Sequence, residues 1–324
     1  MRRSGSAIGV AATAALLVAF FFSCASVRTG NSSRGASSRT SSKSSPTGDS
    51  GPSPAEESRN ASGTPPKAPT AAAPLFSPAS SLEGSVHVKL GIPTDADPSD
   101  DYLLNEKEYV LSYNPKKRVP NWVSWNLDRA HLGHVPRRND FRSDPLLPPP
   151  LYRVTPQDYT NSGYDRGHMC PSADRTKTVS GNQSTFLMTN MQPQLHELNA
   201  GPWEKLEEFE REMAKRPNAE LYILAGGIFS PSFVTVGHNV AVPKSNYKIV
   251  VELSRGEGPK DVTPQTPVVA VIMPNRLGVG QHEWTDFLVS VDEIERKTGY
   301  EFLSKLPDAV QRTIEAKVGA PPAP

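Results

Sequence analysis

Residues 189–211 read TNMQPQLHELNAGPWEKLEEFER and hold the most informative pattern of the chain. Within this stretch, four side chains of different chemistry recur at intervals of four residues. On an α-helix such positions lie along one slowly drifting ridge. An amide, an indole, a carboxylate and a guanidinium on one ridge are unusual for a surface that meets only solvent, although the indole by itself is most simply a core aromatic. The four residues are Asn199, Trp203, Glu207 and Arg211.

The helix that carries this ridge is predicted to span residues 199–215 and to stop before Pro217. Simpler interpretations of the same side chains stay open. Asn199 could act only as the cap at the start of the helix. Glu207 and Arg211 could form an ordinary surface ion pair, which contributes little.

A second polar cluster lies upstream, at Asp165-Arg166-Gly167-His168-Met169. A turn-rich stretch precedes it and a proline follows, so we expect a strand end or a loop, where side chains can face a cleft. Asp165 is more simply a hydrogen-bond brace than a second base. Taken alone, His168 would more often be a surface or core-edge residue than a catalytic one.

Three segments together resemble the DNA/RNA non-specific endonuclease family, the ββα-metal nucleases. They are residues 165–168 (Asp-Arg-Gly-His), 190–194 (Asn-Met-Gln-Pro-Gln) and 199–207 (Asn-Ala-Gly-Pro-Trp-Glu-Lys-Leu-Glu). Residues 172–177 and 242–245 also match the type secreted by cyanobacteria. The resemblance covers about residues 85–317, and the combined motif is highly specific, whereas Asp-Arg-Gly-His alone would be weak.

The residue pattern itself favours an α+β domain with an antiparallel or mixed central sheet flanked by helices. Strands outnumber helices, and no regular βαβ alternation is visible. Further helices are expected at 290–297, after a Ser/Asp cap, and at 308–317, after a proline. The resemblance adds a ββα-metal active-site motif. Strand character occurs at 107–113, 121–127, 185–188, 221–225, 247–253 and 268–273.

The resemblance implies three roles around a bound metal. His168 would be the general base that activates the attacking water, and its reference pKa of about 6.5 suits proton abstraction near neutral pH. Asn199 would be the one direct protein ligand of Mg²⁺ or Mn²⁺, since Mg²⁺ accepts a neutral amide oxygen and keeps several waters. Glu207 would hydrogen-bond the water shell of the metal.

Arginines would complete the site. In similar nucleases an arginine four positions before a phenylalanine contacts the phosphate and stabilises the transition state. Here that position is Arg137, and Arg138 is its rival because this loop varies in length across the family. Arg166 and Arg211 would also contact phosphate or brace the site.

The resemblance therefore implies an endonuclease that hydrolyses DNA and RNA and leaves 5′-phosphate ends. Its partners would be nucleic acids held through the phosphate backbone, which gives no sequence specificity. Residues 85–324 carry 27 basic and 30 acidic side chains, so bulk charge cannot hold nucleic acid and local arginines must do so. We recognise no feature that would bind an inhibitor protein.

Other interpretations of the same residues stay open. Cys170 would share a face with His168 on an extended segment, which permits a Cys/His nucleophile, although a small packing residue is simpler. A nuclease-like module that binds nucleic acid or a protein without cutting is the alternative function. A zinc site is conceivable from four histidines, but they lack metalloprotease spacing; these are His168, His196, His238 and His282.

Residues 1–24 are predicted to be a signal peptide. Two arginines give it a charged start, and its apolar run from Ala7 to Phe22 is too short for a comfortable membrane span of about 20 residues. Cys24 directly follows this run and resembles the lipidated cysteine of bacterial lipoproteins. We expect export, which ends in a secreted, a periplasmic or a membrane-tethered protein.

The rest of the chain divides by composition. Residues 25–84 are dominated by Ser, Thr, Ala, Pro and Gly, and hold too few large apolar side chains to offset their chain entropy by burial. We predict a disordered linker there, one endonuclease domain at 85–317 and a loose tail at 318–324. If Cys24 is cleaved off or lipidated, only Cys170 remains, so no intramolecular disulfide can form.

Overall fold

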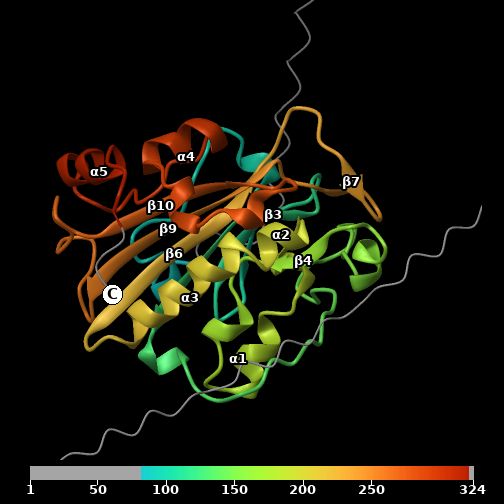
Figure 1. The fold of residues 1–324 in the computed structure, drawn as a ribbon, viewed down its shortest axis with the longest axis horizontal. Helices are drawn as coiled ribbons and strands as arrows, with labels where there is room; N and C mark the ends of the chain where they lie inside the picture. The colour runs from blue at the N-terminus through green and yellow to red at the C-terminus, as the bar shows by residue number, and fades with distance from the viewer. Residues whose placement is uncertain (1–81, 321–324) are drawn as a thin grey trace, which may run out of the picture. The chain divides into compact units, whose positions relative to one another are not determined.

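A computed structural model describes residues 82–320 of the chain (Figure 1). Its main sheet has six strands in the order β1-β2-β3-β6-β9-β10, and every neighbouring pair is antiparallel. The α+β prediction is confirmed, and the sheet is antiparallel. The strands are β1 (Tyr102–Asn105), β2 (Val110–Asn114), β3 (Val119–Asp128), β6 (Ala219–Ile228), β9 (Ser245–Ser254) and β10 (Val268–Pro274).

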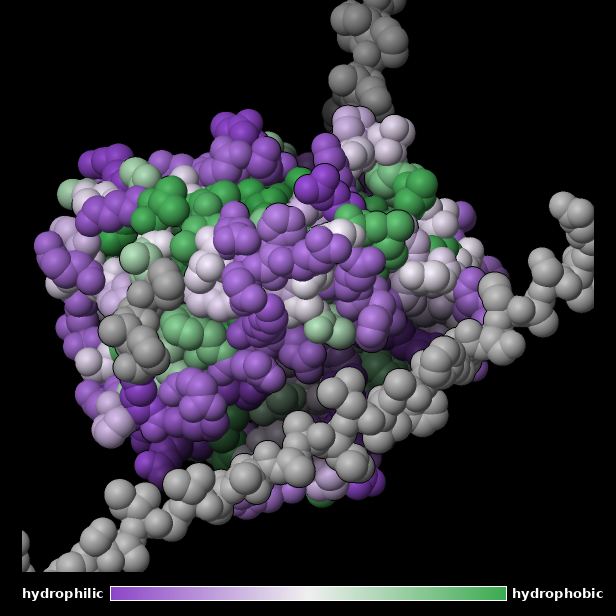
Figure 2. Space-filling model, in the orientation of Figure 1, coloured by the Kyte–Doolittle hydropathy of each residue, from purple (hydrophilic) through white to green (hydrophobic). Residues whose placement is uncertain are grey.

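Helices cover both faces of this sheet (Figure 1). The helix α3 (Pro202–Lys215) packs its buried side, with Trp203 and Leu206, against one face. The helices α4 (Val291–Thr298) and α5 (Asp308–Glu315) cover the other face, where Ile294 and Ile314 join a second core cluster. Hydrophilic residues dominate the outer surface over α3, whereas hydrophobic ones gather near β10 and α4 (Figure 2).

Strand alternation decides which side chain faces which helix layer. On β3, Trp125 belongs to the cluster under α3, while Trp122 belongs to the cluster under α4 and α5. Successive side chains of a strand point to opposite faces, so the position of a residue along the strand decides which helix layer its side chain faces. The same rule applies to a charged residue in an apolar strand. On β9, Val250 lies in the cluster under α3, and Lys248, two residues earlier, shares its side.

A two-stranded antiparallel ribbon stands apart from the main sheet. It consists of β4 (Asp165–His168) and β5 (Met191–Gln194), with His168 opposite Met191. The helix α2 (His196–Asn199) and then α3 follow it directly, so the chain forms the ββα motif that the resemblance implies. The remaining elements are α1 (Val179–Ser184), β7 (Thr235–Val236), β8 (Val240–Ala241) and 3-10 turns at Val86–Val88, Pro98–Asp100, Arg129–His131, Pro156–Tyr159, Ser172–Asp174, Met188–Asn190, Val279–Gln281 and Trp284–Phe287.

Two strand predictions need correction. Residues 107–109 form the turn between β1 and β2, where Lys107 has a φ of 66°, and β1 is not among the expected strands. The strand predicted at 185–188 is wrong, because Thr185 ends α1 and Met188 opens a 3-10 turn. A short apolar run shows only that a segment is buried and cannot separate a strand from a buried turn.

The predicted helix at 199–215 is in fact two helices. Asn199 is the last residue of α2, and Gly201 precedes α3, which begins at Pro202. Proline suits a first helical position because its missing N–H would have no partner there. Asn199 is therefore not the cap of α3, and the expected ridge of four side chains reduces to Trp203, Glu207 and Arg211.

The termini carry predictions that the structure does not reach. The signal segment 1–24, nearly all of the linker 25–84 and residues 321–324 of the tail lie outside the described residues. Within residues 82–320, no helix is both long enough and apolar enough to cross a membrane.

Candidate active site

The glycine of the Asp-Arg-Gly-His segment is required by the ribbon itself. A Cβ at Gly167 would overlap the side-chain amide of Gln194 on β5. The ribbon is also tied to the main sheet, because Gln192 donates from Nε2 to the carbonyl of Pro120 at 2.8 Å and accepts a hydrogen bond from Asn246 at 2.6 Å. These contacts hold β5, the strand that pairs with the one carrying His168.

His168 lies at the end of β4 and is buried between two aromatic rings. Its ring centroid is 5.0 Å from that of Phe186, at a perpendicular angle, and 5.5 Å from that of Phe141. Within the described residues, its buried Nε2 has no hydrogen-bond partner. Burial, with a smaller contribution from the charge of Arg137, lowers the pKa of His168 to about 3. The imidazole is therefore neutral at physiological pH, and no group of the described residues hydrogen-bonds its Nε2.

The same two rings carry two of the predicted arginines. The guanidinium of Arg137 lies 5.1 Å from the Phe186 ring and donates to Ser172 Oγ at 2.9 Å. The guanidinium of Arg166 lies 5.3 Å from the Phe141 ring and donates to a backbone carbonyl at 2.8 Å. Cation–π contacts of this kind hold each guanidinium against one of the two rings that frame the imidazole.

The two candidates for the phosphate-contacting arginine differ in their surroundings. Arg137 is held by Ser172, by Asn139 at 2.7 Å and by the Phe186 ring. Arg138 donates its backbone N–H to Asn182, and its side chain has no hydrogen bond or ion pair within residues 82–320. This arrangement favours Arg137.

Asn199, at the end of α2, is oriented by Asp165, which lies at the opposite end of β4 from His168. Its Nδ2 donates to Asp165 Oδ2 at 3.0 Å, and the same oxygen lies 2.8 Å from Nδ1 of His196. A carboxylate only accepts hydrogen bonds, so it fixes which end of the amide it meets. The Oδ1 of Asn199 is thus turned away from Asp165, which acts as a brace.

Glu207 and Arg211 share one face of α3 and meet a buried aspartate. Arg211 lies 3.4 Å from Asp174 Oδ1 and 3.9 Å from Glu207 Oε2. Asp174 is fully buried and also accepts a hydrogen bond from the indole of Trp125 at 2.9 Å. Burial raises the pKa of Glu207 to about 8, against the opposing charges of Lys248 and Arg211. Without a further cation, Glu207 is therefore protonated in much of the neutral range.

The other candidate chemistries find no support in the geometry. Cys170 is fully buried in the core under α3, where burial raises the pKa of its thiol well above the ordinary range. Its N–H donates to Asn190 Oδ1 at 3.0 Å, so it acts as a packing residue. Three histidines, His196, His238 and His282, each lie beside a different aspartate. Within the described residues, the one group of three metal-ligating side chains is Asp292, Glu295 and Glu315, with no histidine.

Four residues near the site escape the sequence patterns. Phe141 and Phe186 frame His168. In the sequence, Phe141 only marks the position of Arg137, and nothing distinguishes Phe186 from an ordinary core residue. Lys248 and Glu210 form a buried ion pair beneath α3. Lys248 shares its parity in strand 247–253 with Val250 and Glu252, the more polar side of that strand, so alternation alone does not indicate its burial.

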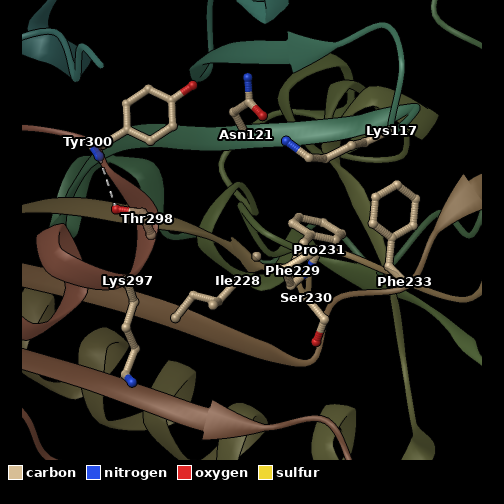
Figure 3. A pocket seen from close by; sticks show the side chains of 11 residues that line it. Lys117, Asn121, Ile228, Phe229, Ser230, Pro231, Phe233, Lys297, Thr298 and Tyr300 are labelled. Carbon is tan, nitrogen blue, oxygen red and sulfur yellow. Dashed lines mark hydrogen bonds between the residues drawn. The ribbon is translucent and has the colours of Figure 1, made fainter. Parts of the chain in front are cut away.

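A surface pocket of about 330 Å³ lies elsewhere, at the end of β6 (Figure 3). Lys117, Lys297 and Tyr300 line it together with Phe229 and Phe233. Both lysines already have a carboxylate partner, Lys117 at 3.5 Å and Lys297 at 3.1 Å. The pocket contains none of the predicted site residues.

A buried histidine on a two-stranded ribbon, with an asparagine and a glutamate on the helices that follow, defines a nuclease of the ββα class. The model of one family, described as DNA/RNA non-specific endonuclease, matches residues 87–309. The chain therefore belongs to the DNA/RNA non-specific endonuclease family, and it is a nuclease, a hydrolase that acts on nucleic acid.

Individual proteins agree with this assignment. A nuclease of Nostoc sp. is 47% identical over 239 residues, which are 72% of this chain and 86% of that protein. The mitochondrial nuclease EXOG of Danio rerio is 32% identical over 67% of this chain and 64% of that protein. Among solved structures, the EndoG/EndoGI complex matches with a TM-score of 0.60 and 28% identity, over 69% of this chain and 92% of that one.

Proposed function

We propose that this nuclease is an exported, metal-dependent endonuclease that cuts DNA and RNA with little sequence preference and leaves 5′-phosphate ends. The observation that carries the proposal is the neutral imidazole of His168, whose buried Nε2 lies near the charge of Arg137 and has no hydrogen-bond partner among residues 82–320. A buried polar atom without a hydrogen bond is rare and costly, so it calls for a functional reason.

His168 is proposed as the general base. Its Nε2 accepts a proton from the water that attacks phosphorus, and the imidazolium forms as the bond to the 3′ oxygen breaks. A pKa of about 3 would make this nitrogen a weak base. The charge of Arg137 contributes to that low pKa, so a substrate phosphate placed on Arg137 would offset it and strengthen the base.

A divalent cation fits the side chains that lie across the ribbon. Asn199 offers an amide oxygen whose orientation is fixed by Asp165, and oxygen ligands of this kind suit Mg²⁺ or Mn²⁺. The raised pKa of Glu207 fits a carboxyl group whose ionised form would be stabilised by a bound cation. When bound, the cation supplies positive charge to the scissile phosphate and the leaving oxygen.

The absence of base preference is proposed from the nature of the contacts. Arg137, Arg166 and Arg211 are cations suited to phosphate, and phosphate contacts position a nucleic acid without reading its sequence. The related EndoG was solved as a complex with its inhibitor; whether this chain has such a partner is open to a binding assay.

Export is proposed on the sequence of residues 1–24 alone, with Cys24 as the site of lipidation or its neighbourhood as the site of ordinary cleavage. Metabolic labelling with a radioactive fatty acid separates the two. Label on the wild-type chain and none on Cys24→Ala would establish lipidation. Absence of label on both chains would show that Cys24 is not lipidated.

The activity is tested on purified residues 82–324 with supercoiled plasmid and with RNA, in Mg²⁺ or Mn²⁺ and again in EDTA. We expect cleavage of both substrates only with metal. Polynucleotide kinase should label the 5′ ends of the products only after a phosphatase has removed their phosphates. Metal-dependent cleavage of neither substrate would instead support the alternative, a module that binds nucleic acid without cutting it.

A further inference from the structure

A pair of opposite charges is buried directly beneath the candidate site. Lys248 on β9 and Glu210 on α3 are both completely inaccessible to solvent, and the ammonium lies 3.2 Å from each carboxylate oxygen. Burying such a pair costs so much desolvation that apolar residues of similar volume are often as stabilising or more so. Stability therefore does not explain why the core contains these two charges.

Two indoles surround the buried ammonium. The Nζ of Lys248 lies 4.4 Å from the ring centroid of Trp203 on α3 and 5.7 Å from that of Trp125 on β3. Both distances fall within the range of about 6 Å in which a cation is attracted to an aromatic face. One cation thus holds two rings that come from different elements.

Each indole directs its N–H toward a different half of the site. Trp203 donates from Nε1 to the carbonyl of His168 at 3.3 Å. Trp125 donates from Nε1 to Asp174 at 2.9 Å, and Asp174 in turn lies 3.4 Å from Arg211. The histidine and the Arg211–Glu207 face of α3 are therefore linked to one buried cation through two short chains of contacts.

We propose that Lys248 and Glu210 are positioning residues, which fix the relative placement of His168 and the Arg211–Glu207 face through Trp203 and Trp125. Neither residue touches the substrate. The inference rests on the nuclease function proposed above. A displacement of about 1 Å between reacting groups can lower a rate by about 100-fold, so the pair contributes to the rate rather than to substrate affinity.

The test replaces both charges at once, in Lys248→Met/Glu210→Leu, so that no lone charge stays buried. We expect a folded protein with an unfolding midpoint close to that of the wild type. Its kcat on plasmid should fall by about 10- to 100-fold, and its KM should change less than threefold. The matched control, Lys215→Met/Glu212→Leu, removes an exposed ion pair from the last turn of the same helix and should keep the wild-type kcat.

A second variant tests one link with all charges in place. Trp203→Phe keeps a ring beneath the ammonium but removes the N–H that reaches the His168 carbonyl, so kcat should fall about 3- to 10-fold. Combined with the double replacement, its effect should be less than multiplicative, because both act along one chain of contacts.

Three results would overturn the inference: a kcat within threefold of wild type in the folded double variant, a loss carried by KM alone, or fully multiplicative effects of the two changes. If the double variant does not fold, a wild-type kcat in Trp203→Phe overturns it. Failure of the wild-type chain to cut nucleic acid would instead contradict the proposed function, so the two failures are distinguishable.

Discussion

Two histidines of this protein are equally buried and chemically different. His87 and His168 are each 6% exposed, and burial lowers the pKa of the first to about 4 and of the second to about 3. Both nitrogens of His87 are used, since Nε2 lies 2.9 Å from the carbonyl of Lys107 and Nδ1 accepts the N–H of Asn126 at 3.1 Å. The Nε2 of His168 has no such partner among the described residues.

The difference separates a structural histidine from the proposed catalytic one. The fold neutralises both rings by burial, but it satisfies only His87 with backbone groups. At His168, the described part of the chain offers Nε2 no hydrogen bond, and the ring lies between two aromatic rings that also hold Arg137 and Arg166. Burial alone therefore does not mark a candidate catalytic histidine, whereas a buried nitrogen that has no partner among the described residues and lies near the charge of Arg137 supports the proposal for His168.

The largest expected effect is on the rate. His168→Ala should lower kcat by about 10²–10⁴-fold, the contribution typical of a positioned general base. Plasmid affinity, measured by fluorescence anisotropy in Ca²⁺ or without metal, should stay within threefold of wild type. A large loss of affinity with an unchanged kcat would assign His168 to substrate binding instead.

The next effect concerns the metal. Asn199→Ala should raise the Mg²⁺ concentration needed for half-maximal activity by about 10- to 100-fold, because the proposed ligand is lost. His196→Ala is the matched control, since His196 bonds the same oxygen of Asp165 but is exposed, and its Mg²⁺ requirement should stay at the wild-type value. Equal behaviour of the two variants would remove Asn199 from the metal site.

His87→Ala should act on stability and spare the rate. It leaves the N–H of Asn126 and the carbonyl of Lys107 buried without partners, which costs about 1–3 kcal/mol. Urea unfolding should register this loss, while kcat per folded molecule should remain within threefold of wild type. A kcat reduced as strongly as that of His168→Ala would erase the distinction between the two histidines.

The smallest effect is on the pH dependence of stability. Because the folded pKa of His168 is lowered to about 3, the unfolded chain binds one more proton at this residue as pH falls from about 6.5 toward 4, so His168 makes a destabilising contribution there. His168→Ala lacks this contribution, so the stability of the wild type relative to this variant should fall by about 1 kcal/mol per pH unit. Glu207 opposes the trend in both chains, because its raised pKa lowers stability as pH rises from about 4.5 to 8. Urea midpoints at pH 6.5 and 5 measure the difference, and identical slopes would show a charged His168.

Much of the fold follows from local sequence, and the exceptions have physical causes. The long strands β3, β6, β9 and β10 and the capped helix α4 lie where apolar runs and caps predict them. Residues 185–188 form a turn instead: their side chains are buried, but the segment pairs with the rest of the described chain only through one β-bridge, between Leu187 and Arg142. The break between α2 and α3 depends on the Gly201-Pro202 pair, at which α3 begins. The four-residue spacing of the side chains runs across this break and therefore suggests one continuous helix.

The residues of the site likewise fall into those that local sequence reveals and those that only tertiary packing reveals. His168, Asn199 and Glu207 could be found because they lie in a dense motif within one continuous segment. Phe141 and Glu210 could not, since an aromatic residue beside an imidazole and a carboxylate beneath a helix acquire their roles only from tertiary packing. Lys248 could not be found either, because the partners that define its role come from β3 and α3.

The most direct test of His168 as the base is single-turnover cleavage of plasmid by His168→Ala and His87→Ala, with enzyme and Mg²⁺ in excess and with increasing imidazole. We predict that His87→Ala cuts at the wild-type rate regardless of imidazole. His168→Ala should be at least 100-fold slower and should recover in proportion to the neutral imidazole present. A rate for His168→Ala within tenfold of wild type, without imidazole, would contradict the proposal that this ring accepts the proton.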